Sequence, residues 1–342
     1  MNHELRLGTR GSQLALWQAN AVARRIAETG GPACEIVVIK TTGDRLQEAP
    51  LSDSGGKRLF VKEIEDALLR NEIDLAVHSS KDLPVVLPDG LAIGGVLPRE
   101  DPRDAVILPA SHPGCASVGD LVAILGQNPR IGTSSVRRIA QLMRMLPGAR
   151  FAPIRGNLDT RLRKLDEGGY DAIVLAAAGL RRLGFSHRIS MTLPAEACVP
   201  APGQGIVAVE IRESDAELGQ VVKRISDASA NAALEAERAV IDMLGGGCQT
   251  PVGALATFVT SRESRVGEPR VASDESRLDL RVIAVVVALD GSRAVRAHAS
   301  GDVVNARLIG KAVGSQLLAE GAADILAAAS ASGAVKPPVS SE

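Results

Sequence analysis

The stretch Ile131-Gly132-Thr133-Ser134-Ser135-Val136-Arg137-Arg138 carries the pattern that decides the fold. Its apolar start is typical of a short strand. The chain then passes a glycine and three hydroxyl residues, after which Val136, Ile139 and Met143 recur at helical spacing. A strand that leads directly into a helix is the repeating unit of α/β proteins. The stretch therefore predicts an α/β fold.

Short apolar runs alternate with helical patterns elsewhere in the chain. A second helical pattern places Leu158, Leu162 and Leu165 on one face before it stops at Gly168-Gly169. We therefore expect sheets whose faces are covered by helices. The predicted buried strands are residues 35–40, 73–77, 91–97, 105–108 and 172–176.

The composition is that of a globular protein and excludes some functions. The chain has 342 residues, which predicts two or three domains, and we expect three. Aromatic residues make up only 2%, which excludes base stacking on aromatic platforms, so we expect no nucleic acid partner. The formal net charge is -1, so any anion must be bound by a local cluster of cations.

The cysteines and the apolar segments indicate the compartment. Cys34, Cys115, Cys198 and Cys248 lie far apart without a CxxC pair, which argues against a zinc or dithiol site, and we expect no metal. Free thiols are typical of a reducing compartment. No apolar segment has membrane-spanning length. We therefore expect a cytoplasmic protein without a membrane partner and, since no long amphipathic seam is evident, a monomer.

Two segments have the composition of connections between domains. Residues 97–104 are rich in proline and charge, and residues 200–205 read Pro-Ala-Pro-Gly-Gln-Gly. They predict a double hinge, after which the chain returns to its first domain with a strand near residues 206–211. The predicted boundaries are 1–101 with 206–224 for the first domain, 105–199 for the second, 228–329 for the third, and 330–342 for a disordered tail.

The third domain is predicted to be a smaller α+β unit. A helix from about residue 230 ends at the glycine run 245–247. The charged segment 261–277 is expected to be a surface loop. Strand patterns cover residues 252–259, 279–289 and 293–299, and a long helical pattern covers residues 303–320.

Arginines gather at the predicted strand-to-helix turns. Arg137 and Arg138 stand in the first turn of a helix, where the helix dipole disfavours cations. They are explained if they share an anion with the free amides of that turn; the alternative is a solvated basic face. Further arginines would converge with them at the carboxyl ends of the strands, which favours a ligand with several carboxylates. These are Arg10, Arg155, Arg161, Arg181 and Arg182.

Two other residues are candidates for chemistry. Asp82 follows a predicted strand directly and suits an acid or the counter-ion of a cationic intermediate; the alternative is a turn residue before Pro84. Cys248 follows the glycine run, which favours an exposed and reactive thiol. The other cysteines are expected to be small buried side chains.

Taken in order, these segments resemble the porphobilinogen deaminase (hydroxymethylbilane synthase) family over essentially the whole chain. The resemblance implies two domains like those of periplasmic binding proteins, which form a clamp around the active site, and a smaller α+β domain at the C-terminus. The matching segments are residues 7–15, 56–57, 59–60, 77–84, 99–105, 132–138, 155–157 and 246–249.

The resemblance also implies the reaction. Four porphobilinogens are condensed head to tail on a dipyrromethane cofactor, one per chain, which the enzyme makes from its own substrate and holds through a thioether to Cys248. Asp82 matches the catalytic aspartate, which assists the loss of ammonia and stabilises the resulting cation. Water then releases hydroxymethylbilane. The implied partners are porphobilinogen and the growing linear polypyrrole.

The resemblance divides the carboxylate-binding residues into two groups. Residues expected to hold the cofactor are Lys81, Thr133, Ser135, Arg137, Arg138, Arg155 and Arg161. Residues expected to bind substrate are Arg10, Ser12, Gln18, Lys57, Ser79 and Arg182. The sequence departs from the family at Asp53, where bacterial relatives often have lysine, so we assign that position no role.

Two functions of other classes remain as alternatives. A non-catalytic anion-binding module would need neither Cys248 nor Asp82. A different transferase or lyase, acting on phosphorylated substrates, is favoured by the turn at residues 132–135 but lacks a Walker-type loop and an acidic magnesium-binding cluster.

Overall fold

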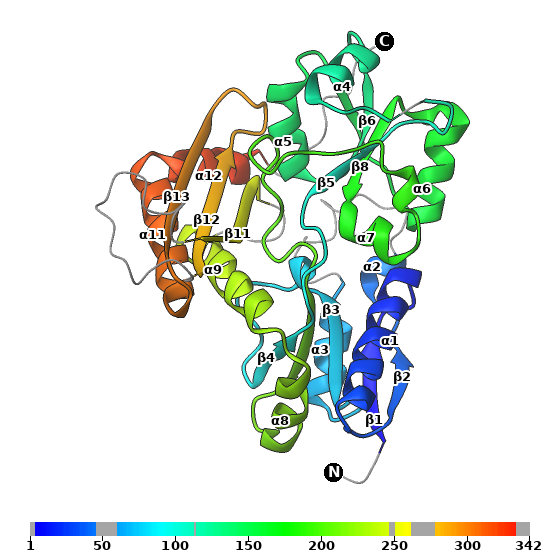
Figure 1. The fold of residues 1–342 in the computed structure, drawn as a ribbon, viewed down its shortest axis with the longest axis vertical. Coiled ribbons are helices and arrows are strands. Elements are labelled where there is room, and N and C mark those ends of the chain that lie inside the picture. The colour runs from blue at the N-terminus through cyan, green and yellow to red at the C-terminus, as the bar shows by residue number, and fades with distance from the viewer. Residues whose placement is uncertain (1–3, 46–59, 113, 246–249, 261–277, 333–342) are drawn as a thin grey trace.

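The fold consists of two five-stranded sheets and one three-stranded sheet, each packed against helices (Figure 1). The structure is a computed structural model and describes residues 4–45, 60–112, 114–245, 250–260 and 278–332. This arrangement confirms the predicted α/β class with a smaller α+β unit. Cys248, Lys57, Asp53 and the segment 261–277 lie outside the described residues.

The first sheet has the strand order β2-β1-β3-β10-β4. Strand β10 is antiparallel to both of its neighbours, so the strand expected near residues 206–211 does return to this sheet. Leu5, Leu75 and Val209 are buried against α1 and α8. The elements are β1 (Leu5–Thr9), α1 (Gln13–Glu28), β2 (Cys34–Val38), α2 (Thr42–Arg45), α3 (Lys62–Leu69), β3 (Leu75–Ser79), β4 (Leu91–Val96), β10 (Val207–Arg212) and α8 (Ala216–Ile225).

The second sheet has the order β7-β6-β8-β5-β9 and carries the stretch quoted first. Strand β6 passes through Gly132 into α5, as predicted. A Cβ atom at Gly132 would lie 2.9 Å from Ile173, so the close approach of β6 to β8 requires glycine. The elements are β5 (Asp104–Ile107), α4 (Val118–Leu125), β6 (Arg130–Gly132), α5 (Val136–Met145), β7 (Arg150–Ala152), α6 (Leu158–Lys164), β8 (Ala172–Ala176), α7 (Ala177–Arg182) and β9 (Met191–Thr192).

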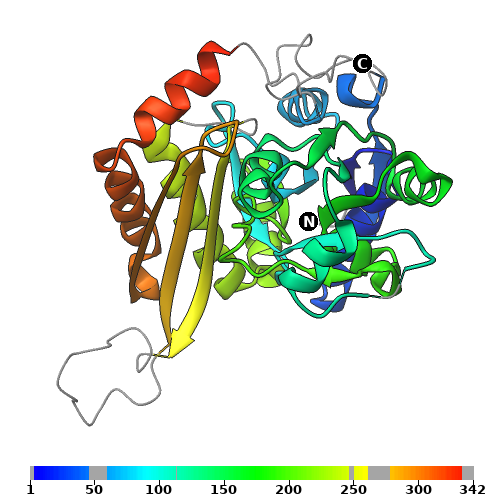
Figure 2. The ribbon, with the colours of Figure 1, turned by 90° about the horizontal axis from the view of Figure 1, so that it is seen from above.

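The third sheet is an antiparallel meander of β11, β12 and β13. Helices α9 and α11 cover one face, and the other face is turned toward the rest of the molecule (Figure 2). On that second face, Leu255 and Val285 pack with Ala140 of α5. The elements are α9 (Ala228–Leu244), β11 (Val252–Thr260), β12 (Leu278–Val287), β13 (Ala294–Asp302), α11 (Ala306–Ala319) and α12 (Ala322–Ala331).

Some local expectations were wrong. Strand β2 is not buried: it pairs with β1, stands at the end of the sheet order, and leaves Val38 52% exposed. The helix expected over residues 303–320 begins as a 3-10 turn, Val303–Asn305. Helix α12 was not predicted as a separate element, and it extends to Ala331, inside the segment assigned to a disordered tail. Residues 333–342 lie outside the described residues.

The two predicted connections run side by side. The amide of Glu100 donates to the carbonyl of Gly205 at 3.1 Å, and the amide of Leu97 donates to the carbonyl of Val207, the first residue of β10, at 3.0 Å. Gly205 has a φ of +88°, and a Cβ atom there would lie 2.3 Å from the Glu100 carbonyl oxygen. The contact between the connections therefore depends on this glycine. Among the helices that the structure describes, none is long and apolar enough to cross a membrane.

Candidate active site

Asp82 lies in a short turn at the end of a central strand. Strand β3 ends at Ser79, and a 3-10 turn over Ser80–Asp82 follows. The amide of Ser80 donates to the carbonyl of Ile206 at 3.0 Å, and the Leu83 side chain is buried, so both ends of the turn are fixed. The Asp82 side chain is half-buried. Asp82 is therefore the turn residue that one interpretation expected, and its charge also acts on Lys81 and Arg161.

Lys81 is held beside Asp82 in a cationic environment. Its Nζ lies 3.4 Å from Oε1 of Gln204. Burial lowers the pKa of Lys81 to about 8; Asp82 and Asp104 oppose this shift, while Arg138 and Arg137 add to it. A lysine with such a pKa binds a proton more weakly than an exposed one. The carboxylate of a ligand beside Lys81 would raise its pKa again.

Arg137 and Arg138 share one buried carboxylate. A guanidinium nitrogen of Arg137 lies 2.7 Å from Oδ2 of Asp104, and Nε of Arg138 lies 2.9 Å from Oδ1. All three side chains are buried. Burial would raise the pKa of Asp104, but the two guanidiniums hold it well below its usual range. The anion that these arginines require is thus, in part, supplied by the chain itself.

Arg161 and Arg155 extend the cluster. Nε of Arg161 donates to the carbonyl of Gly156 at 2.9 Å. Burial lowers the pKa of Arg161 to about 10, Arg138 and Arg155 lower it further, and Asp82 opposes them. These mutual effects show that Arg138, Arg155, Arg161 and Asp82 lie in one electrostatic neighbourhood. The convergence of these arginines on a ligand with several carboxylates stays a prediction.

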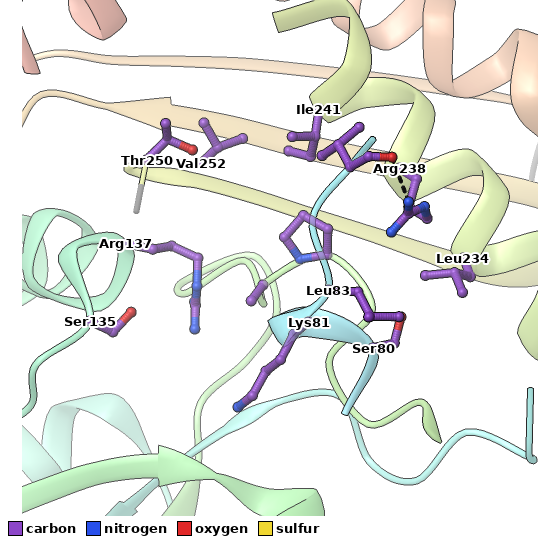
Figure 3. Close-up of a pocket in the computed structure, with 13 residues that line it drawn as sticks. Ser80, Lys81, Leu83, Ser135, Arg137, Leu234, Arg238, Ile241, Thr250 and Val252 are labelled. Carbon is purple, nitrogen blue, oxygen red and sulfur yellow. Dashed lines mark hydrogen bonds between the residues drawn. The ribbon is translucent and has the colours of Figure 1, made fainter. Parts of the chain in front are cut away.

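Part of the cluster opens into a pocket between elements of all three sheets. Figure 3 shows the side chains of Lys81 and Arg137 extending the same way from separate elements, with Ser135 beside Arg137. Thr250, two residues after Cys248 in the sequence, lines the same pocket. Thr133 is buried next to it, and its hydroxyl accepts the amide of Ser135 at 3.3 Å. The pocket therefore combines cations with hydroxyl groups.

Two buried polar atoms near this pocket lack a hydrogen-bond partner within the described part of the chain. They are Nε of Arg137 and the hydroxyl oxygen of Ser80. Buried polar groups without a partner carry a cost, which a bound polar ligand would remove.

The residues expected to bind substrate lie along α1 and its surroundings. Ser12 caps α1 by accepting the amide of Ala15 at 3.3 Å. Nε2 of Gln18 donates to the hydroxyl of Ser79 at 2.8 Å, which joins α1 to the strand that ends at the Asp82 turn.

Two arginines of this group already have contacts within the protein. Nε of Arg10 lies 3.1 Å from a carboxylate oxygen of Asp44, and its guanidinium carbon lies 4.3 Å from the centre of the Phe60 ring. Arg182 donates to the carbonyl of Gly205 at 2.7 Å and stands over the ring of Trp17. Among the contacts that the structure shows, none joins Arg10 or Arg182 to Lys81.

Three residues of the site were not predicted. Asp104 holds the arginine pair, Gln204 contacts Lys81, and Arg238 of α9 lines the pocket from the third domain. Asp104 has a signal in the sequence, since it is an acidic residue at the start of an apolar strand, but Gln204 and Arg238 have none. Across the described ranges, no three His, Cys, Asp or Glu side chains gather as metal ligands.

Comparison with known proteins places this geometry in a family. Residues 5–220 match the family model "Porphobilinogen deaminase, dipyromethane cofactor binding domain", and residues 232–319 match "Porphobilinogen deaminase, C-terminal domain". The chain belongs to the porphobilinogen deaminase family. The cofactor of the family's larger domain is dipyrromethane, and the cation cluster lies within the matched residues.

Relatives named porphobilinogen deaminase are similar over nearly their whole length. The protein from Syntrophobacter fumaroxidans is 42% identical over 323 residues, 94% of this chain and 96% of its own. That from Desulforudis audaxviator is 44% identical over 329 residues, 96% of this chain and 98% of its own. A solved ancestral cationic amino acid solute binding protein aligns with 69% of this chain and 93% of its own, at 14% identity and a TM-score of 0.40.

The residues present fit a dipyrromethane. Each of its two rings carries an acetate and a propionate, so the group is a polycarboxylate. The cluster offers Lys81, Arg137, Arg138, Arg155 and Arg161 against the carboxylates of Asp82 and Asp104, which leaves an excess of positive charge. Burial is the main cause of the lowered pKa values of Lys81 and Arg161, and Nε of Arg137 is a buried donor without an acceptor within the described residues.

Proposed function

We propose that this chain is a transferase that condenses four porphobilinogens head to tail on a dipyrromethane primer and, after hydrolysis, releases hydroxymethylbilane. The observation that carries the proposal is the half-buried carboxylate of Asp82 beside Lys81, within a cluster of buried arginines. Membership of the porphobilinogen deaminase family supports it. The same proposal includes a monomer in the cytoplasm that binds no nucleic acid.

Five cations bind the carboxylates of the primer. Arg137, Arg138, Arg155 and Arg161 supply planar donors that match acetate and propionate groups, and Lys81 supplies a point charge. The hydroxyls of Ser135 and Thr133, at the start of α5, add neutral donors. Because much of this cluster is buried, each ion pair is stronger than it would be in water.

Asp82 carries the catalytic role. Loss of ammonia from porphobilinogen leaves a cation at the substrate's methylene carbon, and a fixed carboxylate close to it stabilises that charge. The short turn after β3 holds Asp82 in place, so little reorganisation is needed when the charge forms. The same carboxylate would accept hydrogen bonds from pyrrole nitrogens. Asp82 thus has an electrostatic and a positioning part in the step.

The primer, when bound, supplies the nucleophilic α-carbon to which each new ring is joined. We assign its thioether attachment to Cys248, which lies outside the described residues. Thr250 supports the assignment, since it lies close to Cys248 in the sequence and lines the pocket that contains Lys81 and Arg137.

We assign incoming substrate to the group along α1. Gln18 lies on α1, Ser12 caps that helix, and Arg10 precedes it; Ser79 ends β3 and Arg182 ends α7. Lys57 belongs with them by resemblance to the family. The ion pair of Arg10 with Asp44 and the contact of Arg182 with Gly205 would then exchange for substrate carboxylates.

Elongation by four units requires room, and we propose that the connections at residues 97–104 and 200–205 act as a double hinge between the domains at 1–101 with 206–224 and at 105–199. The hydrogen bond from Glu100 to Gly205 would keep the two crossings moving together. Locking the two domains by a cross-link should then slow at least one elongation step. Full rates for all four steps in the cross-linked protein would rule out the hinge.

The test of the function is the intact mass of the purified protein under denaturing conditions, before and after addition of porphobilinogen, with Cys248→Ser as the control. We expect an adduct of two pyrrole units on the parent, none on the variant, and growth in single-unit steps with substrate. A bare polypeptide mass that stays bare after porphobilinogen is added would refute the proposal.

A further inference from the structure

Asp104 joins groups that come from distant parts of the chain. It is fully buried at the first position of β5, where the connection at residues 97–104 ends. Its carboxylate accepts hydrogen bonds from Arg137 at 2.7 Å, from Arg138 at 2.9 Å and from Nε2 of Gln204 at 2.9 Å. One carboxylate therefore orients two guanidiniums and one amide.

Gln204 extends this arrangement to the Asp82 turn. Its side chain is buried, and its Nε2 also donates to the carbonyl of Pro102 at 2.6 Å. Its Oε1 lies 3.4 Å from Nζ of Lys81. Gln204 belongs to the second connection, and its side-chain amide therefore contacts both the first connection and Lys81, the residue next to Asp82. The two acceptors on its nitrogen fix its orientation.

The charges are arranged so that the cations remain available to a ligand. Arg137 and Arg138 carry two positive charges, and Asp104 offsets one of them. Carboxylates and guanidiniums keep these charges when buried only if they are paired. Without Asp104 the two adjacent guanidiniums would repel each other within the buried site. With it, they are held together and Nε of Arg137 is left over as a donor.

We propose that Asp104 and Gln204 are positioning residues, which set Arg137 and Arg138 on one side of the site and Lys81 on the other in the spacing that the carboxylates of the primer and substrate require. The proposal rests on the function proposed above. Neither residue contacts reacting atoms in this scheme, since Gln204 acts through Lys81 and Asp104 acts through the two arginines.

The decisive variant is Gln204→Met, which keeps the length of the side chain but removes its hydrogen bonds without burying a new charge. We expect most purified chains to lose the two-pyrrole adduct, and chains that retain it to show a KM for porphobilinogen raised about tenfold with a smaller change in kcat. Asp104→Asn, which removes the charge and keeps the shape, should show the same pattern more strongly.

The matched control is Asp101→Asn. Asp101 is a carboxylate of the same connection, but it pairs with Arg103 at 2.9 Å and with Arg181 at 3.0 Å, outside the cluster. We expect its adduct and its KM to match those of the parent. Urea unfolding of each variant separates a general loss of stability from a change at the site.

Two outcomes would overturn the inference. One is that both variants fold and retain the adduct with the KM of the parent. The other is that Gln204→Met and Asp101→Asn lose the adduct equally. If Asp104→Asn does not fold, Gln204→Met decides the question alone. A parent protein that never forms the adduct would instead count against the proposed function, so the two failures are distinguishable.

Discussion

Arg238 of α9 donates a hydrogen bond of 2.9 Å to the main-chain carbonyl of Pro84, two residues after Asp82. The same guanidinium nitrogen reaches the carbonyl of Val85 at 2.5 Å. Helix α9 ends at Leu244, four residues before Cys248 in the sequence. The helix that leads to the proposed attachment residue is therefore tied to the loop that follows the proposed catalytic residue.

Replacement of Arg238 by methionine should loosen this tie. The variant loses hydrogen bonds from a charged donor, for which we expect a loss of about 1.5–3 kcal/mol in the free energy of unfolding and a fall in kcat, because the Asp82 turn is less fixed. Urea unfolding and steady-state kinetics measure the two effects. Arg307→Met is the control. Arg307 of α11 makes an exposed ion pair with Asp242 of α9, and its replacement should lower the free energy of unfolding by less than about 1 kcal/mol. Equal losses in the two variants would contradict the assigned role.

Asp82→Asn should fold and keep its primer yet turn over very slowly. The amide keeps the shape of the side chain but removes the charge that stabilises the substrate cation, and we expect kcat to fall by about 10²–10⁴-fold. Asp89→Asn serves as the control, because Asp89 is an exposed residue in the turn before β4, and its activity should stay within about twofold of the parent. Near-normal turnover of Asp82→Asn would remove Asp82 from the mechanism.

The sequence predicted the individual helices and strands better than it predicted which of them lie next to one another. The passage of β6 into α5 was evident from local periodicity and from Gly132. Arg137 and Arg138 are buried, so the alternative of a solvated basic face was wrong, whereas a ligand anion shared with the free amides of that turn stays a prediction. The anion that the structure shows beside them is a carboxylate of the chain itself. That this anion includes Asp104 was not predicted, because the pair joins residues 33 positions apart through the order of strands in the second sheet. The exposure of β2 was misjudged for the same reason, since its apolar run does not reveal that the strand pairs with β1 at the edge of the first sheet.

The contact between the two connections predicts an unequal effect of two glycine substitutions. Gly205→Ala must accept a φ of +88° and a Cβ atom 2.3 Å from a carbonyl oxygen, so we expect a loss of about 3 kcal/mol or more in the free energy of unfolding. Gly184→Ala meets a similar φ of +79° but has nothing within 4 Å of the added Cβ, and about 1–2 kcal/mol should be lost. Urea unfolding midpoints compare the two. Losses of the same size would show that the close approach to Glu100 is not a constraint.

The pKa of Lys81 predicts how primer loading depends on pH. In the protein without primer, burial lowers this pKa from the usual 10.5 to about 8. Lys81 is therefore protonated below pH 8 and loses its charge as the pH rises through that value, while the arginines stay charged. Carboxylate binding favours the protonated form, so the rate at which primer-free protein acquires the two-pyrrole adduct should fall above about pH 8.

Lys81→Arg separates this effect from other titrations. Arginine remains charged throughout the range, so the variant should load primer more slowly at pH 7, because the geometry has changed, but should show no decline through pH 8. Intact mass after timed exposure to porphobilinogen, at a series of pH values, measures both profiles. If the loading rate of the variant declines by the same amount and with the same midpoint, a group other than Lys81 controls the loading. The primer carboxylates would then not require the charge of Lys81.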